Sequence, residues 1–250
     1  MTARWSAAGV GASILVAAGI AKAQTGSAEA NVAAPFGSPI QDRRIYWHGL
    51  FDQFEARIGT ENSFRWDGEG WVGTDTNRLW LKSEGTVTNG TVGDGSHQAL
   101  YDRPLTTYFD VQAGIRYDID SGPSRGWAAL GIQGLAPQWF DVEVTLYASD
   151  SGHFAARFEA FYELLLTNRL ILEPQIELNF YSKSDPGRST GSGLSDLDAG
   201  LRLGYQFTRK FAPYIGVVFE DKFGDSAAFA RRQGETVNDA RFAVGIRSWF

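Results

Sequence analysis

Residues 195–207 read SDLDAGLRLGYQF, and apolar and polar side chains alternate along almost the whole stretch. The apolar side chains fall on one face, at Leu197, Ala199, Leu201, Leu203, Tyr205 and Phe207. A period of two residues is that of an extended strand, in which successive side chains point to opposite faces. The alternation is longer than a common strand of about five or six residues. The stretch therefore predicts a long strand with one apolar and one polar face.

The same alternation dominates the chain from about Trp47 onward, most clearly in residues 108–118, 138–148, 153–164, 169–180 and 240–250. We predict about twelve strands, centred near residues 52, 67, 82, 100, 113, 130, 143, 158, 175, 202, 217 and 245. The first four segments are the least regular, and Asp52 falls on the otherwise apolar face, so about ten strands is an alternative. Pro174 removes a backbone donor from another strand, where we expect a bulge.

The length and spacing of these strands favour a barrel that crosses a membrane. A soluble sheet buries its apolar face, whereas a membrane barrel turns that face toward lipid and lines its lumen with polar residues. A tilted strand needs about 9 to 11 residues to cross a bilayer, close to the length of these segments. Short connections such as APQ and TNR alternate with long ones such as SKSDPGRSTGSGLS and FGDSAAFARRQGETVND. We therefore predict an all-β fold, an antiparallel transmembrane β-barrel in the lipid bilayer of the outer membrane.

The two ends of the chain fit this location. The first 23 residues resemble a cleaved secretory signal peptide, with Arg4 ahead of an apolar run and Ala-Lys-Ala before the cleavage point. Residues 24–45 are expected to form a flexible periplasmic leader, which leaves residues 46–250 for the barrel. We expect the last strand to close the barrel against the first, and its final Phe250 to be read by the assembly machinery, as in other outer-membrane barrels. An aromatic girdle at the periplasmic interface is expected at Phe109, Phe140, Phe207 and Phe250.

Acidic residues dominate the predicted lumen. The inward acids are expected at Glu55, Asp67, Glu69, Glu84, Asp110, Asp118, Asp141, Glu143, Glu159, Glu163, Glu173, Glu177, Asp196, Asp198 and Glu220. The inward bases are fewer, at Arg57, Arg65, Lys82, Arg116, Arg157, Arg202, Lys222, Arg241 and Arg247. An excess of acids draws cations into a lumen by its field, although the same side chains also fill a barrel as ion pairs. The chain is acidic overall, with a formal net charge of −6, which argues against nucleic acid as a partner.

The side-chain groups that could bind a metal ion are carboxylates and imidazoles, which suit Cu(II) or Zn(II). The chain has no cysteine, and its one methionine is Met1. We expect two of its histidines at the extracellular rim and His48 near the leader. The candidate metal ligands are His97, His153, Glu159, Glu173, Glu177, Asp196 and Asp198.

The sequence contains no motif for catalysis, so we expect that the protein is not an enzyme. It has no G-x-S-x-G sequence and no cysteine nucleophile, and its Gly- and Ser-rich segments GDGSHQ and GSGLS are typical of loop tips. A hydrolase with an Asp/His pair at the outer rim is the least favoured alternative.

Six segments, taken in order, resemble the copper resistance protein B family of outer-membrane barrels. They lie at residues 65–85, 98–118, 130–143, 165–179, 191–217 and 245–250, and begin with RWDGEGWVGTDTNRLWLKSEG. The resemblance implies an outer-membrane protein of copper resistance that binds or passes copper ions and acts beside a periplasmic multicopper oxidase. Members of the family often carry a Met- and His-rich stretch ahead of the barrel, and residues 24–45 contain neither residue type. The alternative function is a structural or partner-docking barrel with a sealed lumen.

Overall fold

In this computed structural model the described residues are 44–119 and 122–250. The predicted signal peptide, and all of the predicted leader except Arg44 and Ile45, lie outside them. The strands are β1 (Tyr46–Ile58), β2 (Ser63–Gly73), β3 (Arg78–Thr88), β4 (Thr91–Val92), β5 (Ser96–Pro104), β6 (Phe109–Asp118), β7 (Arg125–Ala136), β8 (Phe140–Ser149), β9 (Phe154–Phe161), β10 (Leu164–Leu165), β11 (Leu170–Tyr181), β12 (Gly193–Tyr205), β13 (Phe211–Lys222) and β14 (Asn238–Trp249). The helical segments are η1 (Pro137–Trp139), η2 (Pro186–Arg188) and α1 (Gly224–Gln233).

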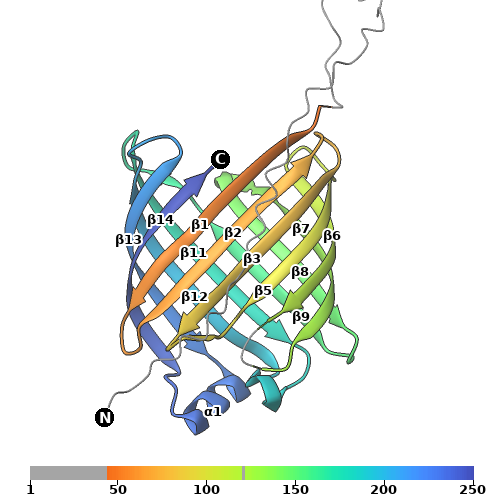
Figure 1. Ribbon diagram of the computed structural model, residues 1–250, viewed down its shortest axis with the longest axis vertical. Coiled ribbons are helices and arrows are strands. Elements are labelled where there is room, and N and C mark those ends of the chain that lie inside the picture. Colours follow the sequence, from red (N-terminus) through yellow and green to blue (C-terminus); the bar gives the residue numbers. More distant parts are fainter. Residues whose placement is uncertain (1–43, 120–121) are drawn as a thin grey trace, which may run out of the picture. The chain divides into compact units, whose positions relative to one another are not determined.

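The strands form one closed antiparallel sheet (Figure 1). β1 pairs with β2 and β14, and β11 pairs with β9 and β12, so the described sheet closes on itself. β4 and β10 are two-residue extensions beside β3 and β11, which leaves twelve long strands. The prediction of a twelve-stranded antiparallel barrel is confirmed, and each predicted strand centre falls within one of these strands. No helix in the described part of the chain is long and apolar enough to cross a membrane.

Alternation sorts the side chains into an apolar outer face and a polar inner one. On β14, Phe242 and Val244 are 45% and 43% exposed, whereas Arg241 and Ala243 beside them are 7% and 0% exposed. Buried charged and amide side chains gather inside the barrel, while leucine, isoleucine, valine and phenylalanine cover its outside. This is the reverse of a water-soluble barrel and matches a barrel whose outer face contacts lipid.

The two ends of the barrel differ in their connections. The first residue of β1, Tyr46, and the last residue of β14, Trp249, lie at the same end of the barrel. The turns between strands at that end are three to five residues long. The opposite end carries the two longest connections, residues 182–192 and 223–237, the second of which contains α1 (Figure 1). Short turns face the periplasm and long loops face outward in outer-membrane barrels. We therefore name the two ends periplasmic and extracellular.

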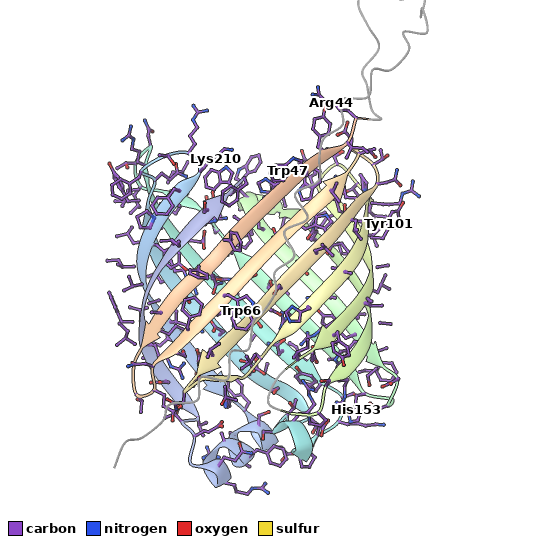
Figure 2. All side chains as sticks on the ribbon, viewed as in Figure 1. Arg44, Trp47, Trp66, Tyr101, His153 and Lys210 are labelled. Carbon is purple, nitrogen blue, oxygen red and sulfur yellow. The ribbon has the colours of Figure 1, made fainter. Side chains whose placement is uncertain are left out.

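Aromatic side chains gather at the periplasmic end, as the girdle prediction requires. Phe140, Phe207 and Phe250 are 43%, 64% and 55% exposed, and Phe109 is half-buried. Trp47 is exposed at the same end, whereas the label of His153 marks the opposite end (Figure 2). Phe250 also contributes to closure, since its backbone N–H donates to the Gly49 carbonyl at 2.9 Å.

Asp52 does not face lipid, and this corrects the expectation from simple alternation. The register of β1 shifts between Phe51 and Gln53 against β2, so a β-bulge inserts one extra residue there. The bulge changes the side-chain parity, and Asp52 turns inward to form an ion pair with Arg247 at 2.8 Å. The irregularity of the first segments thus has a local cause and does not change the strand count.

Pro174 interrupts the ladder without adding a residue, so the expected bulge is absent at this position. The pairs Phe161–Gln175 and Leu164–Leu172 share one register on either side of it. The strand that pairs with this part of β11 is interrupted between β9 and β10, because the proline on β11 lacks the N–H that the ladder needs there. Tyr162 still donates its backbone N–H to the Pro174 carbonyl at 3.1 Å.

A lysine at the middle of the outer face should test the contact with lipid. Leu130 is central in β7 and 56% exposed, and we expect Leu130→Lys to lower the free energy of unfolding by about 2 to 4 kcal/mol in a bilayer. The control is Leu105→Lys, which changes an equally exposed leucine (58%) in a periplasmic turn and should cost less than about 1 kcal/mol. Urea unfolding from lipid vesicles, followed by tryptophan fluorescence, measures both. Equal and negligible effects would mean that water surrounds the outer face.

Candidate functional site

Six carboxylates form a continuous row on one wall of the lumen. The register places them directly opposite one another on β8, β9, β11, β12, β13 and β14, in the order Glu143, Glu159, Glu177, Asp198, Glu220 and Asp239. We call these six residues the acidic row. Glu143 lies near the periplasmic start of β8, and Asp239 near the extracellular start of β14, so the row climbs along the barrel. Neighbouring strands lie about 4.8 Å apart, and the five steps of the row therefore span about 24 Å.

Cationic side chains offset the acidic row, because like charges directly opposite each other destabilise a sheet. Each of five bases forms an ion pair with at least one member of the row: Arg57, Arg65, Lys82, Arg157 and Arg241. Arg65 on β2 and Glu177 on β11 are five strands apart in the sheet, yet Nη2 and Oε2 lie 3.0 Å apart. Contacts of this kind cross the lumen and hold its two walls together.

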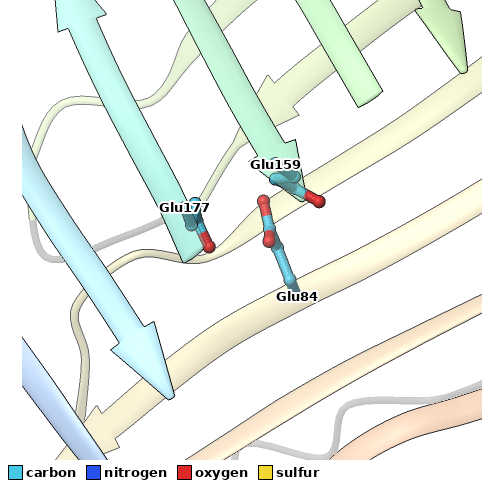
Figure 3. A group of neighbouring side chains, drawn as sticks. All are labelled: Glu84, Glu159 and Glu177. Carbon is cyan, nitrogen blue, oxygen red and sulfur yellow. The ribbon is translucent and has the colours of Figure 1, made fainter. Parts of the chain in front are cut away.

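Two members of the acidic row meet a third carboxylate in the middle of the barrel. One carboxylate oxygen from each of Glu84, Glu159 and Glu177 lies within 4.8 Å of the other two (Figure 3). We call this group the glutamate triad. Arg157 forms ion pairs with all three of its members, and Arg65 lies 3.7 Å from Glu84 and 3.0 Å from Glu177. Two guanidinium groups thus face three carboxylates, and the ionised triad keeps an excess negative charge.

A cavity of about 270 Å³ adjoins the triad and adds further carboxylates. Its lining includes Glu84 and Glu159 of the triad, together with Asp67, Glu69 and Asp141. These last three carboxylates have neither a hydrogen bond nor an ion pair with any described residue. Their oxygens therefore face the cavity without a contact partner and can approach a cation that enters it, and we call this space the central cavity.

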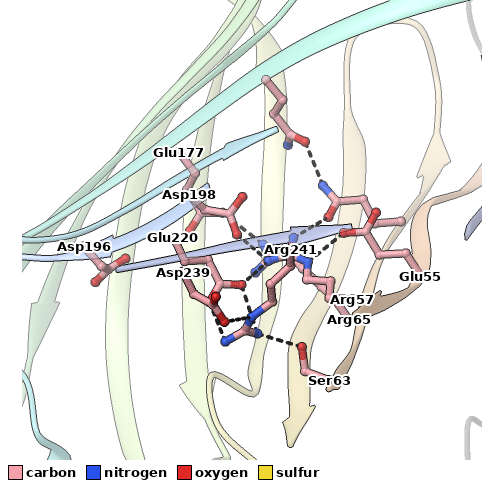
Figure 4. A network of polar contacts seen from close by, with 12 residues as sticks. Glu55, Arg57, Ser63, Arg65, Glu177, Asp196, Asp198, Glu220, Asp239 and Arg241 are labelled. Atoms are coloured by element: carbon pink, nitrogen blue, oxygen red, sulfur yellow. Dashed lines mark hydrogen bonds and ion pairs between the residues drawn. The ribbon is translucent and has the colours of Figure 1, made fainter. Parts of the chain in front are cut away.

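A denser network holds the extracellular half of the acidic row (Figure 4). Arg57 donates from Nη1 to Asp198 at 2.5 Å and to Glu220 at 2.6 Å, and from Nε to Glu55 at 2.8 Å. Arg241 donates to Asp239 at 2.9 Å and reaches Glu220. Every carboxylate named here has a cationic partner, so this part of the lumen is built as a set of ion pairs.

A second cavity, of about 410 Å³, lies in the periplasmic half of the barrel, and we call it the periplasmic cavity. Arg247 lies in its wall and contacts Asp52 at 2.8 Å, Glu163 at 2.6 Å and Glu173 at 2.8 Å. His48, which the sequence did not single out as a ligand, lines the same cavity with its ring 6.4 Å from that of Trp71.

The candidate metal ligands are spread over several of these places. Glu159 and Glu177 lie together in the triad, and Asn179 links Glu177 to Asp196 by donating to both at 2.8 Å. Asp198 lies in the extracellular network, and Glu173 lies beside Arg247.

The two candidate histidines lie away from the triad. His97 is exposed on the outer side of β5, and its Nδ1 lies 3.0 Å from the Ser83 hydroxyl. His153 lies in the turn between β8 and β9, beside Ser151 at 3.2 Å.

The lumen also contains an apolar cluster. The prediction that polar side chains line the lumen did not include it. Five buried residues form it on β3, β5, β7 and β8: Trp80, Leu100, Trp127, Ala129 and Tyr147. Arg116 lies over the Tyr147 ring at 4.7 Å, and the indole N–H of Trp127 donates to Asp118 at 2.7 Å. The signal in the sequence was the presence of tryptophan on strand faces that otherwise carry polar residues.

Comparison with known proteins gives close relatives. The family model described as copper resistance protein B precursor (CopB) matches residues 45–250. The chain is 46% identical over 215 residues to a copper resistance protein B homolog of Pseudomonas syringae pv. tomato, covering 86% of this chain and 73% of the relative. It is 43% identical over 215 residues to copper resistance protein B of Escherichia coli, with the same two coverages.

Solved structures similar to this barrel include two porins. The KdgM porin superposes with a TM-score of 0.51 at 13% identity and covers 82% of this chain and 99% of its own. The NanC porin superposes with a TM-score of 0.53 at 13% identity, with coverages of 81% and 99%. At this identity the likeness shows the barrel fold alone.

Proposed function

The chain belongs to the copper resistance protein B family, and from this premise we propose that it crosses the outer membrane and binds and passes copper ions through its lumen. The acidic row is the observation that carries the proposal. It offers a carboxylate on each of six neighbouring strands, and it climbs from the periplasmic to the extracellular end of the sheet. Five cationic side chains contact the six carboxylates of the row, and the further acids of the central cavity add to this acidic excess. An excess of one charge sign concentrates counter-ions.

We place the principal binding site for the passing ion at the glutamate triad. Three carboxylate oxygens within 4.8 Å of one another are close enough to share one cation. Oxygen ligands hold divalent ions, and Cu(II) binds a given set of ligands more tightly than Zn(II) or the other divalent first-row metals. Cu(I) prefers sulfur, and the chain has no cysteine and one methionine, Met1. The cargo that fits the triad is therefore Cu(II).

Binding at the triad should be weak, which suits passage better than storage. Arg65 and Arg157 already contact these glutamates, so an entering ion must compete with two guanidinium groups. Asp67, Glu69 and Asp141 in the adjoining cavity lack such partners and offer the ion an unobstructed approach.

The remaining parts of the proposal follow from the family. We propose that the barrel lies in the outer membrane, that it is not an enzyme, and that it works beside a periplasmic multicopper oxidase that handles the same metal. A porin-like fold and an apolar outer face support the location.

A second candidate is a structural or partner-docking barrel with a sealed lumen. The extracellular network favours it, because Arg57, Arg202 and Arg241 tie β1 to β12, β13 and β14 by buried ion pairs. A barrel of this kind would pass no ions in a planar bilayer, whereas a copper-passing barrel would pass a cation-selective current.

Calorimetric titration of the refolded barrel with Cu(II) tests the triad. We expect Glu159→Gln to weaken Cu(II) binding at least tenfold, because it replaces an anionic carboxylate ligand with a neutral amide. Among the described residues, the Glu159 side chain has one ion pair, a 3.4 Å contact with Arg157, so little else should change. The matched control is Glu69→Gln, which removes a charge from the same cavity without breaking an ion pair and should stay within about threefold of the parent. Absence of binding by the parent barrel would overturn the proposal. Equal weakening by both variants would show that the general negative field of the cavity, and not the triad, holds the ion.

A further inference from the structure

The central and periplasmic cavities meet at the bulge of β1. Leu50 and Asp52 line both cavities, and no other described residue lines both. Asp52 reaches this position because the bulge turns its side chain inward. Asp52 therefore belongs to the lining of both cavities.

Arg247 crosses the lumen at this wall. From β14 it contacts Asp52 on neighbouring β1, and it also contacts Glu173 on β11, three strands away in the other direction. It further contacts Glu163, which lies in the break between β9 and β10. Pro174 creates that break, and the Glu163 side chain is 43% exposed within it. One guanidinium group thus bridges both sides of the lumen.

The charges at this point are unbalanced. One cation faces three carboxylates, so the ionised group has a net charge of about −2. With the guanidinium removed, the same carboxylates would attract mobile cations to the place where the two cavities meet. Lys222, at the extracellular end of β13, lines neither cavity.

We propose that Arg247 is a fixed cation that occupies the junction of the two cavities and sets how readily mobile cations pass between them. The inference rests on the proposed function, since it names the residue that limits ion passage through the lumen. Asp52, Glu163 and Glu173 position the guanidinium, and Asp52 also supplies negative charge to both cavities. An entering divalent cation would take the place of the guanidinium among these carboxylates.

Planar-bilayer recordings in potassium chloride, without copper, test the proposal. Arg247→Gln should increase the single-channel conductance at least threefold and raise the preference for K⁺ over Cl⁻, measured in a salt gradient. If the parent barrel passes no current in this salt, a current through Arg247→Gln would show that the parent is closed at the junction, whereas a folded Arg247→Gln barrel without current would overturn the proposal and favour a lumen sealed elsewhere. Lys222→Gln is the control, because it also removes a cationic side chain, but one that lines neither cavity and pairs with Glu235 at the extracellular end, and its conductance should match that of the parent. A folded Arg247→Gln barrel with parental conductance and selectivity would overturn the proposal.

Asp52→Asn provides the second variant, and its expected effect has the opposite sign. Loss of this carboxylate should lower the preference for K⁺ at least twofold, because the guanidinium stays and one negative charge leaves both cavities. General loosening of the barrel would not shift the two variants in opposite directions. If Arg247→Gln fails to fold, unchanged selectivity of Asp52→Asn overturns the proposal by itself. Copper binding at the glutamate triad is measured separately, so failure at the junction and failure of the proposed function give different results.

Discussion

Arg57→Met should lower the free energy of unfolding of the barrel by about 3 to 5 kcal/mol, because it removes one partner from a set of buried ion pairs. The Arg57 side chain is 1% exposed, and it contacts Glu55, Asp198 and Glu220. Glu55 would keep Arg202, and Glu220 would keep Arg241. Asp198 has no other cationic partner among the described residues, so most of the loss should arise there. Methionine fills a similar volume, which limits the contribution of a cavity.

Urea unfolding from lipid vesicles measures the effect of Arg57→Met, and two further variants identify its cause. Arg57→Met combined with Asp198→Asn should recover part of the loss, because it removes the carboxylate that the first change leaves unpaired. Lys222→Met breaks an exposed pair with Glu235, whose side chains are 41% and 46% exposed, and should cost less than about 1 kcal/mol. A loss below about 1 kcal/mol for Arg57→Met would contradict a buried network that depends on this residue.

The strands and their facing were predictable because both follow from a local period. Each strand alternates over about ten residues, and a lipid-facing surface leaves no freedom for the apolar side chains. All the carboxylates of the acidic row except Asp239 were therefore expected inside the barrel from parity alone. The two-residue alternation predicts the wrong face where the backbone is irregular. Asp52 is an example, since one extra residue in a β-bulge turns its side chain from the outer to the inner face.

Which carboxylates meet was not predictable, because that depends on register and closure. Glu159 and Glu177 are direct partners on adjacent strands, but their pairing is set across a break at Pro174. Glu84 joins them from β3, on the far side of the lumen, and only closure of the barrel brings it there. Local alternation carries no information about such contacts, since it fixes the face of a residue and not its height in the barrel.

The aromatic cluster marks a second limit of alternation, because the inner face of a barrel need not be polar along its whole length. Trp80, Leu100 and Trp127 occupy inward positions on β3, β5 and β7, where they pack with Tyr147. Apolar side chains inside the barrel bury area that water would otherwise contact, which adds stability that ion pairs alone do not supply. The cluster and the charged networks are thus two separate means of filling one lumen.

Trp127→Ala should therefore lower the free energy of unfolding by about 3 to 5 kcal/mol, the range observed for removal of large buried side chains. Trp127 is 5% exposed, and its indole packs near the rings of Tyr147 and Tyr181. Trp127→Phe keeps much of the packing but loses the donor to Asp118, and should cost about 1 to 3 kcal/mol. The control is Trp139→Ala, which truncates a turn tryptophan that is 68% exposed and should change stability by less than about 1 kcal/mol. Equal losses for Trp127→Ala and Trp139→Ala in vesicles would show that the lumen cluster adds nothing beyond the contribution of any aromatic side chain.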